Sequence, residues 1–364
     1  MSEVLIDARP LQGPSGHRGI GRYAGGLLQG LAAIGYEHSV LVDADLPEPD
    51  FPKTVTQIHA TRRRSHGRLA GYEDSVALAN DLKRIRPALF HAVSLALPGR
   101  SPCPVAVTVH DLIPWAFGGW RMVGERFRFG AARRLLPRAE LVFAVSESTA
   151  ADLRRLAGVE DRRIRVVYEG LDPLFRPRPA ARERVATRWR QERPYFLFVG
   201  ALDVRKDPRG LLRAWAVARE AGAQLDLLVA GDPGRQAPVS MGEARLLGRV
   251  DDEELADLLS AAACLLFPSL YEGFGLPPLE ALGCGCPVVA YRNSSLPEVV
   301  GEAGVLVPNR DAEALGRAAA ELVLNEKLRR RVIAGGRKQA ARFTWERAAR
   351  GTVAGYRAAL AAAP

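Results

Sequence analysis

Short apolar runs rich in branched side chains alternate with longer segments of helical periodicity along most of the chain. This alternation is typical of βα units, in which the buried strands of one parallel sheet are connected by helices. In the first half, the pattern predicts strands at residues 4–7, 39–42, 89–91, 105–110, 141–145 and 165–168. In the second half, it predicts strands at residues 195–200, 225–231, 245–247, 264–268, 287–290 and 305–307. The pattern therefore predicts two successive α/β sheets.

A proline-rich segment separates the two predicted sheets. Residues 172–179 have the sequence D-P-L-F-R-P-R-P, and their prolines disfavour regular structure there. We therefore predict a first domain of residues 1–175 and a second domain of residues 176–344. The alanine-rich end of the chain, residues 345–364, is predicted to form a further helix.

Length and composition narrow the class of protein. A chain of 364 residues is long enough for two domains with separate cores, and its 48% apolar content favours an ordered globular protein. The apolar runs are too short to span a bilayer, and no charged and then apolar signal segment opens the chain. These features predict a cytoplasmic protein.

Charge and cysteine content narrow the class further. The net charge is +10, but the basic clusters are dispersed and are not interleaved with aromatic residues, so we expect no nucleic-acid partner. A basic surface can instead hold the protein peripherally at the inner face of an anionic membrane. The four cysteines lack paired C-x-x-C spacing and neighbouring histidines, so we expect free thiols, no disulfide and no structural zinc.

The most informative motif is F-P-S-L-Y-E-G-F-G-L-P-P-L-E, residues 267–280. Glu272 and Glu280 lie on either side of a glycine turn and a predicted helix start. Gly273 and Gly275 lack a Cβ atom, so the backbone there can approach a ligand closely, and a helix N-terminus attracts anions. Two carboxylates around such an anion site suit a phosphorylated, hydroxyl-rich ligand such as a nucleotide sugar. Alternatively, the glutamates only cap and solvate a strand–turn–helix segment.

This motif resembles the signature of glycosyltransferase family 4, and the resemblance extends over nearly the whole chain. It implies a retaining transferase of GT-B architecture: an α/β fold of two facing Rossmann-like domains with parallel sheets, and a C-terminal helix that crosses back to the first domain. It also implies that Glu272 contacts donor-sugar hydroxyls and that Glu280 holds the nucleotide ribose. The backbone implied to meet the diphosphate and sugar belongs to Gly273, Phe274, Gly275 and Leu276.

A second motif follows the first predicted strand of the second domain. Gly200 ends that strand and is an expected donor-binding residue, and Arg205 and Lys206 lie in the loop that follows. The two cations can be ordinary surface charges, but a fixed cation also stabilises the negative charge that develops on a departing diphosphate. The resemblance implies this role, with the Arg/Lys pair in place of a divalent metal. We therefore expect no metal and no cofactor; the nearest Asp-x-Asp match, residues 43–45, lies in a first-domain connection.

Two segments of the first domain also carry candidate residues. Gly19 and Gly21 belong to the glycine-rich segment of residues 15–23, which suits either a tight turn or a phosphate contact. His110 follows an apolar strand, where it either caps a turn or contacts a ligand; at its unperturbed pKa it is mostly neutral at pH 7. The resemblance implies that the glycines reach the donor phosphate and that His110 lies near the transferring centre. Both segments look most like the mannosyltransferase branch of the family.

Other positions are assigned less specific roles. The resemblance implies that Val250 contacts the nucleotide base, although its surroundings also suit a strand end before a capped helix. The strand-end acids Glu147, Glu169 and Asp172 are interpreted as structural caps. Aromatic side chains crowd one first-domain segment, where they either pack in the core or, because the family places acceptors on this domain, form an acceptor-binding or membrane-facing surface. These aromatic residues are Trp115, Phe117, Trp120, Phe127 and Phe129.

These features predict a retaining hexosyltransferase with a first, acceptor-binding domain and a second, nucleotide-sugar-binding domain. The favoured donor is GDP-mannose, with a UDP-sugar as the alternative, and the acceptor is a hydroxyl of a glycan, a lipid-linked molecule or a small molecule. The predicted catalytic residues are His110, Arg205, Lys206 and Glu272. A nucleotide-sugar 2-epimerase of the same architecture and a non-catalytic sugar-nucleotide binder are the alternatives. A dinucleotide oxidoreductase is disfavoured, because no strand is followed by G-x-G-x-x-G and a well-placed acid.

Overall fold

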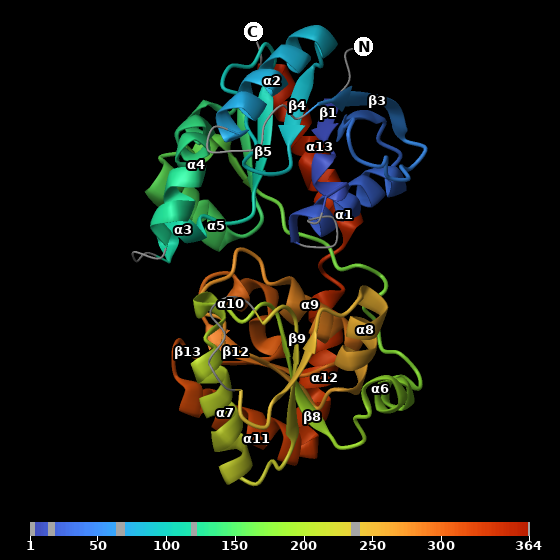
Figure 1. The fold of residues 1–364 in the computed structure, drawn as a ribbon, viewed down its shortest axis with the longest axis vertical. Coiled ribbons are helices and arrows are strands. Elements are labelled where there is room, and N and C mark those ends of the chain that lie inside the picture. The colour runs from blue at the N-terminus through green and yellow to red at the C-terminus, as the bar shows by residue number, and fades with distance from the viewer. Residues whose placement is uncertain (1–3, 14–18, 63–69, 118–121, 234–240, 363–364) are drawn as a thin grey trace. The chain divides into compact units, whose positions relative to one another are not determined.

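The computed structural model describes residues 4–13, 19–62, 70–117, 122–233 and 241–362. The chain divides into two compact units. Unit 1 comprises Met1–Gly170 together with Thr344–Pro364, and unit 2 comprises Leu171–Phe343. Each unit is an α/β body with its own parallel sheet (Figure 1). No helix within the described ranges is long and apolar enough to pass through a bilayer.

The sheet of unit 1 consists of β1 (Val4–Asp7), β2 (His38–Asp43), β3 (Val55–Thr61), β4 (Leu89–Ala92), β5 (Val105–Val109), β6 (Leu141–Ala144) and β7 (Ile164–Val166). The strand order is β3-β2-β1-β4-β5-β6-β7, and every pairing is parallel. All but β3 coincide with predicted apolar runs, as expected for strands covered on both faces. The prediction missed β3 because this edge strand, V-T-Q-I-H-A-T, is largely exposed and has no apolar run.

The helices of unit 1 include the C-terminal helix of the chain. They are α1 (Gly19–Ala33), α2 (Ala70–Ile85), α3 (Ile113–Ala116), α4 (Val123–Leu135), α5 (Glu147–Asp152) and α13 (Trp345–Ala362). α13 packs along α1 (Figure 1). Gly26 of α1 makes room for Trp345, since a Cβ atom on Gly26 would lie 2.0 Å from the indole ring. The C-terminal helix therefore returns to the first unit, as the family resemblance implied.

The sheet of unit 2 consists of β8 (Tyr195–Val199), β9 (Asp226–Ala230), β10 (Arg245–Gly248), β11 (Cys264–Phe267), β12 (Val288–Arg292) and β13 (Val305–Pro308). Its order is β10-β9-β8-β11-β12-β13, again parallel throughout. Each strand coincides with a predicted apolar run. Because β8, β11 and β12 are neighbours and parallel, the loops that follow them leave the sheet at the same edge.

Helices cover the sheet of unit 2 and bury most of the cysteines. These helices are α6 (Ala181–Trp189), α7 (Pro208–Glu220), α8 (Asp252–Ala261), α9 (Leu276–Cys284), α10 (Leu296–Val299), α11 (Ala312–Leu324) and α12 (Glu326–Ala340). Cys264, Cys284 and Cys286 are buried in this unit, and Cys103 of unit 1 is half-buried; all four are free thiols. The proline-rich segment of residues 172–179, at the start of unit 2, contains neither helix nor strand.

Candidate active site

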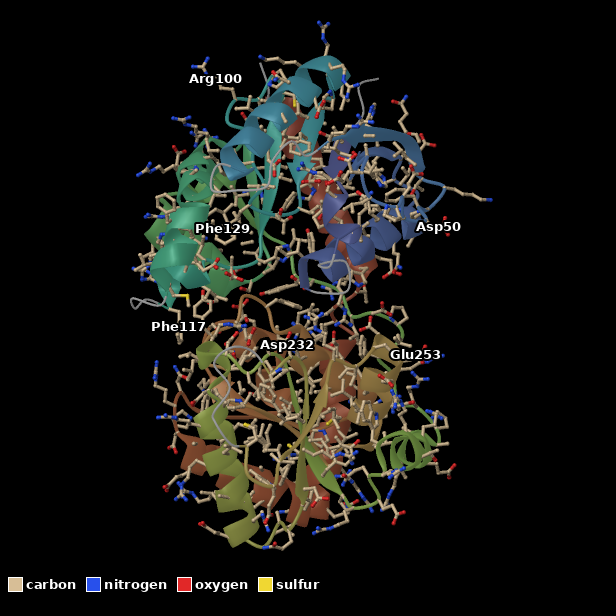
Figure 2. The ribbon with its side chains drawn as sticks, in the orientation of Figure 1. Asp50, Arg100, Phe117, Phe129, Asp232 and Glu253 are labelled. Atoms are coloured by element: carbon tan, nitrogen blue, oxygen red, sulfur yellow. The ribbon has the colours of Figure 1, made fainter. Side chains whose placement is uncertain are left out.

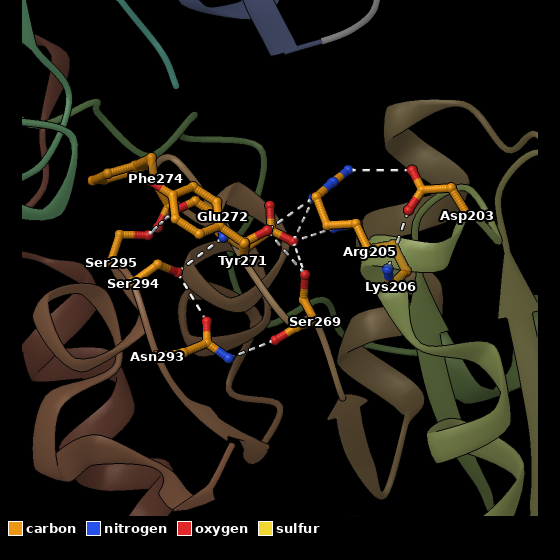
Figure 3. Close-up of polar contacts among 10 residues, drawn as sticks. All are labelled: Asp203, Arg205, Lys206, Ser269, Tyr271, Glu272, Phe274, Asn293, Ser294 and Ser295. Carbon is orange, nitrogen blue, oxygen red and sulfur yellow. Dashed lines mark hydrogen bonds and ion pairs between the residues drawn. The ribbon is translucent and has the colours of Figure 1, made fainter. Parts of the chain in front are cut away.

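A buried carboxylate with two cationic partners lies at the carboxyl edge of the unit 2 sheet. Glu272 belongs to the loop after β11, and its Oε1 accepts hydrogen bonds from Lys206 Nζ at 2.5 Å and from Arg205 Nη1 at 3.0 Å. The hydroxyl of Ser269 also donates to this oxygen (Figure 3). The structure thus brings together Glu272, Arg205 and Lys206, which the sequence contains in two separate motifs.

The turn that follows β8 holds both cations. Asp203 caps the short 3₁₀ helix Val204–Lys206, since its Oδ1 accepts a hydrogen bond from the Lys206 N–H at 3.1 Å. Arg205 Nη2 lies 3.5 Å from Asp203 Oδ2, and Arg205 Nη1 also donates to the carbonyl of Tyr271 at 3.2 Å (Figure 3). A capped turn after one strand therefore directs two positive charges at the loop after the neighbouring strand.

Gly200 makes room for the Lys206 side chain at the end of β8. Its φ is +139°, a conformation that residues with a Cβ atom rarely adopt, and a Cβ atom there would lie 3.2 Å from Lys206 Cε. Lys206 is only 5% exposed, and its Nζ lies 4.5 Å from the centre of the Phe267 ring. The ammonium group is therefore held between a carboxylate and an aromatic face. Gly200 therefore has a steric role in the structure. Its expected contact with the nucleotide sugar stays a prediction.

The neighbouring charges shift the pKa values of Glu272 and Lys206. Burial raises the pKa of the Glu272 carboxyl, but Lys206, Arg205 and the hydrogen bonds to the carboxylate outweigh burial and hold this pKa below its ordinary value. Burial lowers the pKa of the Lys206 ammonium, and the charge of Arg205 acts in the same direction against the attraction of Glu272. Glu272 is therefore ionised at neutral pH, and two cationic side chains face one buried carboxylate.

Three polar residues after β12 hold the backbone of the Glu272 loop. The Glu272 N–H donates to Ser294 Oγ at 2.9 Å, and Ser295 Oγ lies 3.1 Å from the Glu272 carbonyl oxygen and 2.5 Å from that of Phe274. Asn293 Nδ2 donates to the carbonyl of Ser269 at 2.8 Å (Figure 3). The sequence analysis missed these residues; the signal was a run of three polar residues directly after an apolar strand.

The helix start predicted within the motif is confirmed. Gly275, at φ +109°, is the N-cap of α9, Leu276 is its first residue, and prolines occupy its first turn. Phe274 is buried and its ring meets the Phe343 ring edge-on at 5.8 Å, so its side chain anchors the loop in the core. The backbone of this segment, including Gly273, is then the part that can meet an anion at the helix N-terminus.

Two further residues predicted to bind the nucleotide sugar, Glu280 and Val250, also lie in unit 2. Glu280 is buried on α9. Val250 is half-buried between β10 and α8. The capped helix start predicted after Val250 is present, because Asp251 and Glu254 form a reciprocal capping box at the start of α8.

In unit 1, the predicted residue His110 lies directly after β5 and pairs with Glu169. Its Nδ1 lies 3.1 Å from Glu169 Oε1, and its Nε2 lies 3.0 Å from the carbonyl oxygen of Val93. Burial lowers the pKa of His110, but the hydrogen bond and charge of Glu169, with the Val93 carbonyl and Asp111, raise it above its ordinary value. The sequence interpretation of Glu169 as a cap missed this side-chain pair, which raises the pKa of His110 above the unperturbed value assumed from the sequence.

The glycine-rich segment of unit 1 is described only in part. Gly19 is the exposed first residue of α1, and Gly21 is buried within that helix. Residues 15–18 lie outside the described residues. The predicted phosphate contact of this segment stays a prediction.

The aromatic segment of unit 1 combines core residues with one exposed ring. Trp115 packs against the core of unit 1, while Phe117 and Phe129, labelled in Figure 2, are half-buried. Phe127 of α4 is 87% exposed. Trp120 lies outside the described residues. Core packing therefore explains part of this segment but not Phe127.

The Asp-x-Asp match of residues 43–45 has a local role in unit 1. The Asp43 N–H donates to Gln12 Oε1 at 2.6 Å, and the Asp45 N–H donates to Asp43 Oδ1 at 3.1 Å, so these groups stabilise the turn after β2. In the part of the chain that the structure describes, no group of three or more His, Cys, Asp or Glu side chains is arranged to hold a metal ion.

Comparison with protein families finds two matches. The family described as "Glycosyltransferase Family 4" matches residues 17–175, and the family described as "Glycosyl transferases group 1" matches residues 180–339. The first match falls in unit 1 apart from its last residues, and the second falls in unit 2.

Individual relatives agree with these families. The chain is 27% identical to O-antigen chain mannosyltransferase B of Escherichia coli, over 98% of this chain and 99% of that protein. It is 34% identical to the MMP alpha-(1->4)-mannosyltransferase of Mycolicibacterium hassiacum, over 71% of this chain and 66% of that protein. Sucrose-phosphate synthase from Thermosynechococcus elongatus shares the fold, with a TM-score of 0.80 and 24% identity over the full length of both chains.

Proposed function

Since the chain belongs to glycosyltransferase family 4 and has its GT-B fold, we propose that this glycosyltransferase moves a hexose from a nucleotide sugar to an acceptor hydroxyl with retention of configuration. The favoured donor is GDP-mannose, because mannosyltransferases are among its relatives. Unit 2 is assigned the donor and unit 1 the acceptor, as the family resemblance implies. A UDP-sugar is the alternative donor.

The observation that carries this proposal is the cluster of Arg205, Lys206 and Glu272 beside the N-terminus of α9. A nucleotide sugar leaves a nucleoside diphosphate when its glycosidic bond breaks, so negative charge grows on the departing phosphate oxygen. Two fixed cations and the backbone amides at a helix start stabilise such charge without reorganising. Arg205 and Lys206 therefore serve the leaving group, and the segment from Gly273 to Leu276 serves the diphosphate and sugar.

Glu272 is assigned to orientation of the sugar and not to nucleophilic attack. Its carboxylate is ionised, and three hydrogen bonds already reach Oε1, which weakens it as a nucleophile. An ionised carboxylate accepts hydrogen bonds from sugar hydroxyls well. Glu280 and Val250 are assigned to the ribose and the base, and Gly19 and Gly21 to the donor phosphate, as the resemblance implies.

The proposed reaction balances without a carboxylate intermediate. The bond from the sugar C1 to the phosphate oxygen breaks, and its electron pair leaves with the nucleoside diphosphate. The acceptor oxygen bonds to C1 on the same face, and its proton passes to the departing phosphate oxygen. The products are the glycosylated acceptor and the nucleoside diphosphate.

A donor panel and product analysis test this proposal. Thermal unfolding with GDP-, UDP-, ADP- and dTDP-sugars should show the largest rise in Tm with GDP-mannose, because a ligand that binds only the folded state stabilises it. An NMR spectrum of the product should show the anomeric configuration of the donor. Activity should survive EDTA, since the Arg/Lys pair replaces a divalent metal. A product of inverted configuration, or loss of activity in EDTA that Mg²⁺ restores, contradicts the proposal.

Peripheral association with an anionic membrane, at its inner face, is the second part of the proposal. Val123 and Phe127 lie one turn apart on α4 and are 57% and 87% exposed, and the chain carries a net charge of +10. The two exposed apolar side chains suit the acyl-chain region of a membrane, and the positive net charge suits its anionic headgroups. Sedimentation with anionic vesicles should be stronger than with neutral ones and should weaken in Phe127→Ser. Equal sedimentation in both vesicle types contradicts this part.

A further inference from the structure

Unit 1 contains two histidines on neighbouring strands whose ring nitrogens have chemically different partners. His91 of β4 is fully buried, with Nε2 at 2.8 Å from Thr108 Oγ1 and Nδ1 at 2.5 Å from Tyr356 Oη. A hydroxyl group can donate or accept a hydrogen bond. The neutral ring, with one N–H and one lone pair, therefore satisfies both partners of His91 in either tautomer.

The partners of His110 can only accept hydrogen bonds. Val93 contributes a backbone carbonyl oxygen at 3.0 Å from Nε2, and Glu169 contributes a carboxylate oxygen at 3.1 Å from Nδ1. A neutral imidazole has one N–H, so it would direct a lone pair at one of these two acceptors. With Glu169 ionised, only the doubly protonated ring makes both contacts favourable.

We propose that Glu169 is a positioning residue that holds His110 as an imidazolium with both N–H groups donated to the protein. His110 then serves transfer as a fixed positive charge and has no nitrogen that can take a proton from the acceptor hydroxyl. The charge of the ring is independent of the proposed function, whereas its use in transfer rests on that function.

The surroundings of His110 favour this charge. Glu169 and Asp111 are the described acids that raise its pKa, and the Tyr23 ring meets the imidazole edge-on at 4.7 Å from α1. His91 lies on the neighbouring strand β4, where burial and the charge of His110 lower its pKa to about 3. One histidine of the pair is thus kept neutral beside a charged one, which avoids two like charges in one core.

The carboxylate depends on the ring in return. Glu169 is buried, and its Oε2 has no hydrogen-bond partner among the described residues. Its Oε1 faces His110, which is the cationic partner that the described residues give it. A buried carboxylate without a counter-charge is strongly destabilising. The two charges therefore stabilise each other, while the His110 side chain keeps 16% of its surface exposed and reachable.

Histidine NMR of the whole protein tests the charge without any substrate. The chain has six histidines, so a ¹⁵N-histidine spectrum is simple, and His110→Asn identifies the signal of that ring. The His110 ring should show two protonated nitrogens at pH 7 and titrate above 6.5, its ordinary value, while His91 stays neutral throughout. A wild-type His110 ring that titrates below 6.5 overturns the proposal.

Glu169→Gln separates charge from geometry. The amide oxygen can still accept the Nδ1 hydrogen bond, but the negative charge is gone, so the pKa of His110 should fall. Glu169→Asp keeps the charge and should retain part of the elevation. Glu160→Gln, at an exposed site of the same unit, is the matched control and should leave the ring unchanged. An unchanged His110 pKa in folded Glu169→Gln contradicts the proposal.

The pH profile of transfer tests the use of the charge. In the wild type, kcat should fall on the alkaline side as His110 loses its proton, and in Glu169→Gln this limb should move to lower pH by the shift that NMR measures. A limb that stays in place while the NMR pKa moves overturns the positioning role. Absence of any transfer in the wild type refutes the proposed function, and NMR still decides the charge.

Discussion

Unit 1 and unit 2 each bury a carboxylate near the carboxyl edge of a parallel sheet. The two carboxylates differ in the number of cationic side chains that pair with them. In unit 2, two cations and a hydroxyl donate to a single oxygen of Glu272. In unit 1, Glu169 has one cationic partner in the described residues, and the second nitrogen of that ring faces a backbone carbonyl. Arg205 and Lys206 share one buried carboxylate, and the second acid beside Arg205, Asp203, is half-exposed; in unit 1 a single ring faces a single buried carboxylate. The same kind of contact therefore suits ligand binding in one unit and control of a charge state in the other.

Glu272→Gln should have the largest effect, because it removes the buried carboxylate that Arg205 and Lys206 share. Breaking a buried pair costs about 3–5 kcal/mol of stability, and we expect kcat/KM to fall by about 10²–10³. Steady-state kinetics and denaturant unfolding measure both effects. Glu302→Gln, at an exposed site of unit 2, is the matched control. Wild-type turnover in a folded Glu272→Gln protein would remove this site from the mechanism.

Lys206→Met should have the next largest effect and tests the use of the Lys206 charge in transfer. Methionine fills similar buried space without charge, so kcat should fall by about 10²–10³ with a smaller change in stability. Arg209→Met removes an exposed cation of α7 and should leave turnover unchanged. Equal kinetics for the two variants would mean that the charge of Lys206 serves only the fold.

The pH dependence of stability distinguishes the units. The folded pKa of His91 is about 3, against an ordinary value of 6.5, so the unfolded state binds an extra proton between these pH values. This contribution to stability is complete above pH 6.5 and is lost as the pH falls, by about 1.4 kcal/mol per pH unit. The lowered pKa of Glu272 acts in the same direction but only below its ordinary value of 4.5.

Urea unfolding of the wild type and of His91→Gln between pH 7 and pH 5 measures this difference. The variant should lack the His91 part of the slope, because glutamine can still meet both hydroxyls but does not titrate. Parallel slopes in the two proteins would show that His91 is protonated in the folded state.

Gly200→Ala should have the smallest effect of these changes; it strains the backbone and displaces the Lys206 side chain. The strained φ costs about 1–3 kcal/mol, and the new methyl group displaces a side chain at 3.2 Å. We expect turnover to fall about tenfold, an effect of about 1.4 kcal/mol on the barrier. Gly222→Ala has a positive φ of 97° but meets only Leu324 at 3.8 Å, so it controls for backbone strain. If both variants lose turnover equally, the contact with Lys206 is not the cause.

Much of the fold could be predicted because its signals are local. Strands buried on both faces need continuous apolar runs, and each such run became a strand of one of the two sheets. The start of α9 was predicted from glycine and proline, whose backbone preferences act within a few residues. β3 was missed for the same reason, because an exposed edge strand needs no apolar run.

The partners within each site were less predictable. Glu272 and the Arg205–Lys206 pair were recognisable as motifs, but Ser294 and Ser295 follow another strand and hold the loop through backbone atoms. Glu169 lies 59 positions from His110, and nothing in its own neighbourhood distinguishes it from a cap. Pattern analysis cannot choose among such acids, because every strand end carries one or more polar residues.

The sequence by itself determined the alternation of strands and helices, the presence of a C-terminal helix and the residue types of the unit 2 motifs. Only the tertiary structure decided which carboxylate meets which cation, that one buried histidine is neutral and that the acceptors around the other favour a charged ring. The reason is the range of the forces involved. Backbone preference and apolar periodicity act over a few residues, whereas protonation depends on whichever groups folding brings within about 3–6 Å.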